Sequence, residues 1–253
     1  MKNVRIIPRL DIKGPNVVKP VHTEALRVVG NPKELIQRYY REGADEIIYM
    51  DIVASLYQRN LDFDLLKSVT DGIFIPFTVG GGIRSIHDIN SALRSGADKV
   101  AINTFAIHHP EFITEAAKEF GSQCVVLSIE AKKQPNGTWE AYTDGGREPS
   151  GVDAVAWAKK GMELGAGEIM ITSIDRDGTR RGYDLELIKR ITDFAIVPVI
   201  VYGGAGSPEQ VKNVILEGKA DAAAAASVFH YKDFSIGDLK KYLKEENINV
   251  RLL

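Results

Sequence analysis

Two carboxylates end strand-like runs in corresponding parts of the chain. Asp11 follows RIIPRL and Glu130 follows CVVLSI. Two carboxyl groups in different surroundings can act as a general acid and a general base. The alternative is that each only pairs with a nearby cation, such as Arg9, Lys13, Lys19 or Lys132. We favour catalysis because the two acids form a symmetric pair flanked by glycine turns that suit phosphate.

Glycine turns follow strand-like runs at two places, Gly80–Gly82 and Gly203–Gly206. Glycine lets backbone N–H groups approach an anion without obstruction by a Cβ atom. Asn103-Thr104 and Ala226-Ser227 end the next runs and can add donors, and Asp177-Gly178 can clamp the second place. A lone glycine turn is more often only a tight turn. The pairing occurs twice, so we predict a ligand with two phosphates.

The chain repeats itself with an offset of about 120 residues. GADEIIYMD, from Gly43 to Asp51, recurs as GAGEIMITS, from Gly165 to Ser173. The segments IFIPFTVGGGI and IVPVIVYGGAG are related in the same way. We therefore predict two fused half-barrels, approximately residues 1–122 and 123–253.

Strand-like and helix-like runs alternate, which favours a parallel α/β architecture. We predict strands near residues 5–11, 46–51, 75–79, 98–103, 124–130, 168–173, 197–202 and 220–226. We predict helices near residues 32–43, 62–71, 86–96, 110–120, 151–164, 183–193, 208–217 and 236–246. An open doubly wound sheet is the alternative. The two-fold repeat favours closure of the sheet into a barrel, so we predict a single (βα)8 TIM barrel over residues 1–253.

Two connections are longer than simple turns. They run from Ile12 to Gly30 and from Ala131 to Gly151, and the second contains the hairpin signal Pro135-Asn136-Gly137. Both follow strands on the face where barrel active sites lie. They could be surface decoration, but long loops on this face more often complete a site, so we predict lids.

Composition narrows the function classes. The 253 residues carry a net charge of −2, which argues against nucleic acid or an anionic membrane as a partner. The one cysteine, Cys124, excludes an internal disulfide and suits a reducing compartment. No apolar run is as long as a membrane span, and the first residues form a charged strand rather than a signal sequence. We expect a cytoplasmic protein without a metal or cofactor.

Longer motifs across nearly the whole chain resemble the HisF family, the cyclase subunits of imidazole glycerol phosphate synthase. They include RIIPRLDIK, DIVAS, FTVGGGI, GADKVAINT, TSIDRDGT, GGAG and LKKYLKEENINVRLL. The resemblance implies a heterodimer with a HisH-like glutaminase subunit, whose ammonia passes through the barrel. It implies that ammonia reacts there with a phosphoribulosyl-formimino aminoimidazole carboxamide ribotide. The products would be imidazole glycerol phosphate, for histidine biosynthesis, and an aminoimidazole carboxamide ribotide.

The resemblance also implies residue roles. Asp11 matches a catalytic residue on the first strand, and Lys19 matches a lysine of the first lid. Gly82, Asn103 and Thr104 match one phosphate site, and the other is matched by Asp177, Gly178, Gly204, Ala226 and Ser227. An ammonia gate is matched by Arg5, Glu46, Lys99 and Glu168. Asp98 and Gln123 match residues that face the glutaminase.

Three residues depart from the family pattern on the side of the acids. Glu130 stands where the family has Asp, and one extra methylene moves the carboxylate by about an ångström, which can cost on the order of a hundredfold in rate. Arg9 replaces a small or apolar residue and shares a strand face with Asp11. Tyr202 replaces a small residue just before Gly203, near the second phosphate site.

These departures leave alternatives to a cyclase. One is a HisF-like barrel that conducts ammonia to a separate amidotransferase in amidino-sugar biosynthesis. Another is the related HisA isomerase, which has two acids and two phosphate sites but no use for the gate residues. We predict the cyclase.

Overall fold

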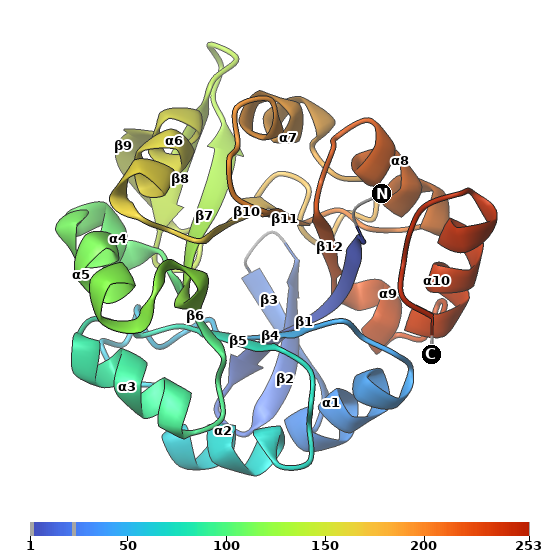
Figure 1. The fold of residues 1–253 in the computed structure, drawn as a ribbon, viewed down its shortest axis with the longest axis horizontal. Helices are drawn as coiled ribbons and strands as arrows, with labels where there is room; N and C mark the ends of the chain where they lie inside the picture. The colour runs from blue at the N-terminus through green and yellow to red at the C-terminus, as the bar shows by residue number, and fades with distance from the viewer. Residues whose placement is uncertain (1–2, 22–23, 253) are drawn as a thin grey trace.

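The strands close into one barrel in the computed structural model, which describes residues 3–21 and 24–252 (Figure 1). The ladder of parallel strands runs β1, β4, β5, β6, β7, β10, β11, β12, and it closes where Arg5 of β1 pairs with Ala222 of β12. Their bounds are β1 (Arg5–Lys13), β4 (Ile47–Asp51), β5 (Phe77–Gly80), β6 (Lys99–Ile102), β7 (Val125–Lys133), β10 (Glu168–Ser173), β11 (Val199–Tyr202) and β12 (Ala222–Ala225). The predicted (βα)8 barrel is confirmed, and the open sheet is excluded.

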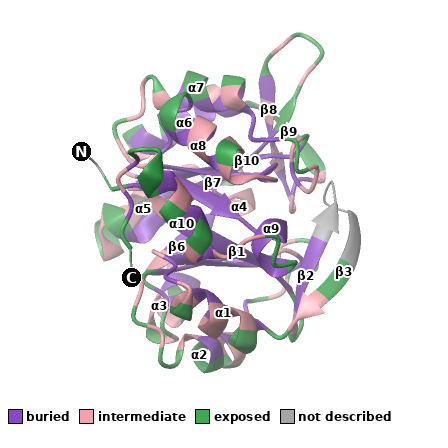
Figure 2. Ribbon diagram, turned by 90° about the vertical axis from the view of Figure 1, so that its right-hand side faces the viewer, coloured by how far each residue is buried: buried purple, intermediate pink, exposed green. Residues whose placement is uncertain are grey.

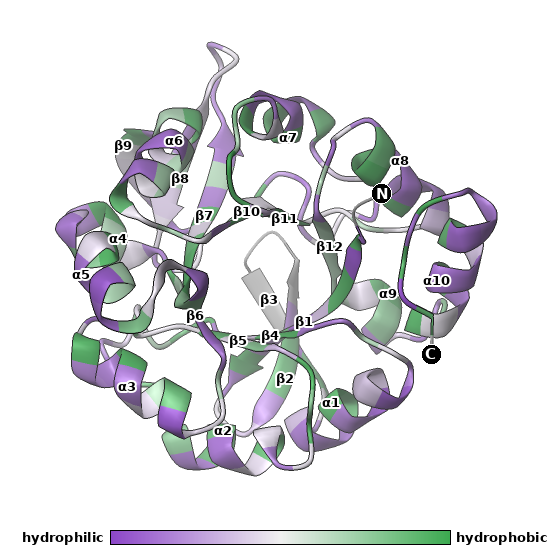
Figure 3. Ribbon diagram, viewed as in Figure 1, coloured by the Kyte–Doolittle hydropathy of each residue, from purple (hydrophilic) through white to green (hydrophobic). Residues whose placement is uncertain are grey.

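The predicted helices form a ring outside the strands (Figure 1). They are α1 (Pro32–Arg41), α2 (Phe63–Thr70), α3 (Ile86–Arg94), α5 (Glu111–Phe120), α6 (Ala154–Leu164), α7 (Leu185–Thr192), α8 (Pro208–Leu216) and α10 (Ile236–Glu245). Side-chain caps set several starts: Asn31 accepts from the backbone of Lys33, and Ser207 accepts from that of Gln210. Each helix carries hydrophobic and hydrophilic stripes, and its buried stripe packs on the sheet (Figure 3).

The two long connections are β-hairpins. They comprise β2 (Asn16–Val21) with β3 (Glu24–Gly30), and β8 (Trp139–Thr143) with β9 (Glu148–Asp153). The strands β2 and β8 continue the sheet as antiparallel neighbours of β1 and β7. Figure 2 shows both hairpins at the same end of the barrel. Helix α6 begins at Ala154 rather than at residue 151, because residues 148–153 pair with β8.

Three short helical segments were not predicted. These are α4 (Thr104–His108), which directly follows β6, α9 (Ser227–His230), which directly follows β12, and the 3-10 turn η1 (Ser122–Cys124). The first two are single turns, too short to show a helical period of apolar residues. Both α4 and α9 begin at a residue that the sequence assigns to a phosphate site, Thr104 and Ser227.

The barrel interior contains an apolar cluster that is separate from the main hydrophobic core. Its members are Ile7, Ile48, Met50, Ala101, Val126, Met170, Ile200, Tyr202, Ala222, Ala224 and Ala226. The alanines of β12 leave little side-chain volume on that side. Charged residues lie at both ends of this cluster.

Carboxylates brace two strand starts at corresponding places in the two halves. The side chain of Asp98 accepts from the Phe77 backbone N–H at 2.8 Å, and that of Asp221 accepts from the Val199 N–H at 2.7 Å. Each bond joins the first residue of one barrel strand to the loop before the next strand.

We predict that Asp98→Ala and Asp221→Ala each lower the free energy of unfolding by about 1–2 kcal/mol, because each leaves a backbone N–H at a strand start without its acceptor. Asn retains an acceptor oxygen, so Asp98→Asn and Asp221→Asn should cost less. Urea denaturation measures the effect as a lower midpoint with an unchanged slope. Equal losses for Ala and Asn would contradict the assigned bonds.

Candidate active site

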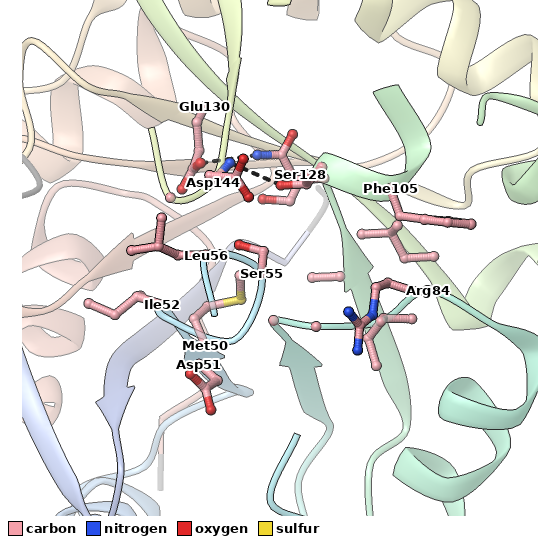
Figure 4. A pocket seen from close by; sticks show the side chains of 18 of the residues that line it. Met50, Asp51, Ile52, Ser55, Leu56, Arg84, Phe105, Ser128, Glu130 and Asp144 are labelled. Atoms are coloured by element: carbon pink, nitrogen blue, oxygen red, sulfur yellow. Dashed lines mark hydrogen bonds between the residues drawn. The ribbon is translucent and has the colours of Figure 1, made fainter. Parts of the chain in front are cut away.

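An open cavity of about 410 Å³ lies at the carboxyl ends of the strands in the first half. Its lining includes Gly81, Gly82, Asn103 and Thr104, and we call Gly82, Asn103 and Thr104 the first cradle. Figure 4 shows Glu130, Asp144 and Ser128 along one wall and Met50 and Asp51 along the other. The sequence therefore located residues that share one cavity.

Backbone geometry explains why glycines form the first cradle. Gly81 and Gly82 have φ of 101° and 72°, in the left-handed region that favours glycine. A Cβ atom on Gly82 would lie 2.7 Å from the carbonyl oxygen of Arg59. The buried Oδ1 of Asn103 has no hydrogen-bond partner within the described chain, so the cradle keeps an acceptor for a ligand hydroxyl.

Asp51 and Arg84 add charge to this cavity. Asp51 ends β4 and binds Arg59 through both oxygens, at 2.9 and 2.6 Å. Sequence reasoning missed Asp51, although the repeat aligns it with Ser173 at the end of β10. A phosphate in the first cradle would meet backbone N–H groups and a nearby guanidinium, both suited to an anion.

The residues assigned to the second phosphate site also lie together, but they enclose little space. Asp177, Gly178, Gly204, Ala226 and Ser227, which we call the second cradle, line a cavity of only about 10 Å³. Lys19 enters it from β2, with its Nζ 2.9 Å from Asp177 Oδ1 and 3.0 Å from the Tyr202 hydroxyl. The residues meet as predicted, yet the side chains of Lys19 and Tyr202 lie beside them and little space is left.

Asp11 lies in a buried cluster of opposite charge. Arg9 Nε donates to Asp11 Oδ1 at 2.9 Å, and Lys19 Nζ lies 3.8 Å from Asp11 Oδ2. Burial alone would raise the pKa of Asp11, but the charges of Arg9 and Lys19 outweigh burial and hold that pKa below its usual value. Asp11 is therefore a carboxylate at neutral pH.

Glu130 has the opposite tendency. Burial raises its pKa to about 7, the nearby carboxylates of Asp11 and Asp177 add to the shift, and Arg9 opposes it. Asn103 Nδ2 donates to Glu130 Oε2 at 3.0 Å and so links the acid to the first cradle. Asp11 and Glu130 line one small cavity of about 20 Å³ together with Thr172. At neutral pH, Asp11 is ionised and Glu130 is near its titration point.

Arg9 and Tyr202 form the centre of the barrel mouth. The Arg9 guanidinium lies 4.1 Å from the centroid of the Tyr202 ring, and its Nη1 donates to the Thr172 hydroxyl at 3.2 Å. Both side chains are almost fully buried. The sequence placed Arg9 on the face of Asp11 but gave no sign of its contact with Thr172, which is 163 residues away.

At the opposite end of the barrel, four charged residues form a ring of ion pairs. Arg5 contacts Glu46 at 2.6 Å and Glu168 at 2.8 Å, while Lys99 contacts the same two acids at 2.8 and 2.7 Å. We call these four residues the charged ring. The resemblance identified all four, and the geometry brings all four together.

The strand-start end also exposes residues around the charged ring. Asp98 and Gln123 are exposed there. Phe74 and Ile196, which precede β5 and β11 at repeat-related positions, are 86% and 85% exposed. Sequence reasoning missed this apolar pair, which the repeat could have revealed. Large apolar side chains so exposed favour contact with another protein.

No group of three or more His, Cys, Asp or Glu side chains in residues 3–21 and 24–252 is placed to hold a metal ion. Within the same ranges, no helix is long and apolar enough to cross a membrane.

Comparison with known proteins identifies the family. Residues 5–235 match the family described as histidine biosynthesis protein. Three similar proteins are named imidazole glycerol phosphate synthase subunit HisF. The protein of Legionella pneumophila is 59% identical over 83% of this chain and 99% of its own. That of Lachnoclostridium phytofermentans is 51% identical over 100% and 98%, and that of Dehalococcoides mccartyi is 48% identical over 100% and 99%. The chain therefore belongs to the histidine biosynthesis protein family and, within it, to the HisF family.

Proposed function

We propose that the protein is the cyclase subunit of imidazole glycerol phosphate synthase, a lyase that acts in histidine biosynthesis within a glutamine amidotransferase complex. The observation that carries the proposal is the pair of acids at the barrel mouth, whose pKa values are moved apart. The names of the relatives support the same activity and do not favour the amidino-sugar alternative.

Asp11 is the base in this proposal, because Arg9 and Lys19 keep it ionised. Glu130 is the acid, because a pKa of about 7 lets it hold a proton and release it near neutral pH. Ammonia attacks the formimino carbon of the ribotide and displaces the carboxamide ribotide. Its nitrogen then condenses with the ribulosyl ketone, whose oxygen leaves as water as the imidazole ring closes, and the acid pair moves the protons. Asn103 positions Glu130 beside the phosphate held by the first cradle.

The charged ring and the apolar interior fit the passage of ammonia. The four side chains of the charged ring neutralise one another at one end of the barrel. The apolar cluster of the barrel interior lies beyond them and contains Ile7, Ala222 and Ala224. A neutral molecule crosses such a layer at far lower cost than an ion. We propose that the charged ring is the entrance gate.

A glutaminase subunit supplies the ammonia and docks on the end that carries the charged ring, forming a heterodimer. The exposed apolar side chains of Phe74 and Ile196, together with Asp98 and Gln123, form its contact surface. We propose a cytoplasmic location, which the one buried, free cysteine suits.

Turnover of the ribotide with ammonium salt tests the cyclase directly, because free ammonia bypasses both glutaminase and gate. Wild type should turn over, and Asp11→Asn should abolish turnover by removing the base. Glu130→Asp should raise turnover, since it restores the shorter reach of the family and moves the carboxylate by about an ångström. Steady-state rates measure all three. Inactivity of both wild type and Glu130→Asp would exclude the cyclase.

The raised pKa of Glu130 predicts how stability changes with pH. Its native pKa of about 7 exceeds the ordinary value of 4.5. Between pH 4.5 and about 7, the native state therefore binds more protons than the unfolded state. This contribution to stability is complete below the ordinary pKa and is lost as pH rises through the native pKa. Glu130→Gln cannot ionise, so it should gain stability relative to wild type as pH rises from about 5 to about 8. Urea midpoints at both pH values measure the difference, and a constant difference would contradict the shift.

The docking proposal predicts that Phe74→Asp weakens the complex with the glutaminase by about tenfold or more, because a charge replaces an apolar contact. The matched control is Tyr57→Asp, which alters an aromatic residue 61% exposed in the loop between β4 and α2, at the other end of the barrel. Calorimetry measures both affinities. Equal affinities for the two variants would place the partner elsewhere.

A further inference from the structure

Gly80 and Tyr202 hold equivalent positions in the repeat, and they make the two halves unequal. Each is the last residue of its strand, β5 or β11, and each precedes a glycine turn. A Cβ atom on Gly80 would lie 2.5 Å from the sulfur of Met50, so a larger residue there would displace the Met50 side chain. Tyr202 instead carries a full ring, 3% exposed, into the mouth of the second half.

The space at each cradle follows this difference. The first cradle opens on a cavity of about 410 Å³, whereas the second cradle has about 10 Å³. The smaller value is about the room that one water molecule needs, and a phosphate is several times larger. The glycines of both turns are present, so the backbone alone does not explain the difference. The side chains of Tyr202 and Lys19 explain it.

The side chains in the second cradle satisfy one another without a ligand. The ammonium of Lys19 bonds Asp177 and the Tyr202 hydroxyl, and Asp11 is the next nearest acid. A buried ammonium is tolerated only when it has such partners. We call the three side chains Lys19, Asp177 and Tyr202 the lysine cluster. In this cluster the Asp177 carboxylate balances the charge of Lys19, which a bound phosphate would otherwise balance.

A phosphate in the second cradle must compete with this arrangement. It brings a charge of about −1.5 to −2 next to the Asp177 carboxylate, which repels it. Lys19 already donates to both oxygens of Asp177 and to the Tyr202 hydroxyl, so a phosphate that binds Lys19 must displace one of these bonds. The Tyr202 ring is also held by the Arg9 guanidinium against its face.

We infer that the lysine cluster takes the place of the second phosphate, so that the protein in this state binds one phosphate group, in the first cradle. A second phosphate binds only after the Tyr202 ring moves out of the cradle, which also releases one bond of Lys19. A bisphosphate therefore binds in order, with the first cradle occupied before the second. The inference rests on the proposed function for its ligand class, but its test needs no turnover.

The test is the number of inorganic phosphate ions that the protein binds, measured by calorimetry and located in phosphate-soaked crystals. Wild type should bind one ion, near Gly82 and Thr104. Tyr202→Ala removes the ring and should bind two, the second near Gly204 and Ser227. Tyr202→Phe is the matched control: it keeps the ring and loses only the hydroxyl, so it should bind one.

Each outcome has a defined meaning. Two ions of similar affinity in wild type, or two in Tyr202→Phe, would overturn the inference, as would a single ion in a folded Tyr202→Ala. If Tyr202→Ala fails to fold, the wild-type number and the Tyr202→Phe control still decide. Loss of cyclase activity in any assay leaves these counts unaffected, so failure of the proposed function and failure of this inference are distinguishable.

Discussion

A closed parallel barrel forces every second residue of each strand into a shared interior, and this constraint governs the rest of the molecule. Charges placed there must neutralise one another, since water cannot reach them freely. The chain meets the constraint with three levels: the charged ring, an apolar middle that includes Ile7 and Met170, and the buried charges around Asp11. The levels are held in register by the same ladder that closes the barrel.

Features with a local signal could be predicted from the sequence. Strand and helix positions were correct to within a few residues where periodicity was clear, and the glycine turns marked one end of the barrel. The first hairpin was missed because Pro20 interrupts its strand-like run, and α4 and α9 are too short to show a period. The filling of the second cradle depends on Lys19 meeting Asp177 across 158 residues, which no local pattern records.

The repeat describes the backbone better than it describes the site. We propose that residues 1–122 and 123–253 are equivalent half-barrels, a division supported by the matching braces of Asp98 and Asp221. Their side chains differ where it matters for binding: Gly80 corresponds to Tyr202, and Asn103 corresponds to Ala226. A duplicated backbone can thus keep two similar turns while the side chains beside each turn differ.

The two acids lie where the barrel strands branch into the hairpins. Asp11 pairs with Met50 of β4 on one side and with Val18 of β2 on the other. Glu130 likewise pairs with Thr172 of β10 and with Tyr142 of β8. A hairpin that swings away from the barrel must therefore bend its parent strand at the residue that carries the carboxyl group. A displacement of either hairpin would therefore displace the carboxyl group of Asp11 or Glu130.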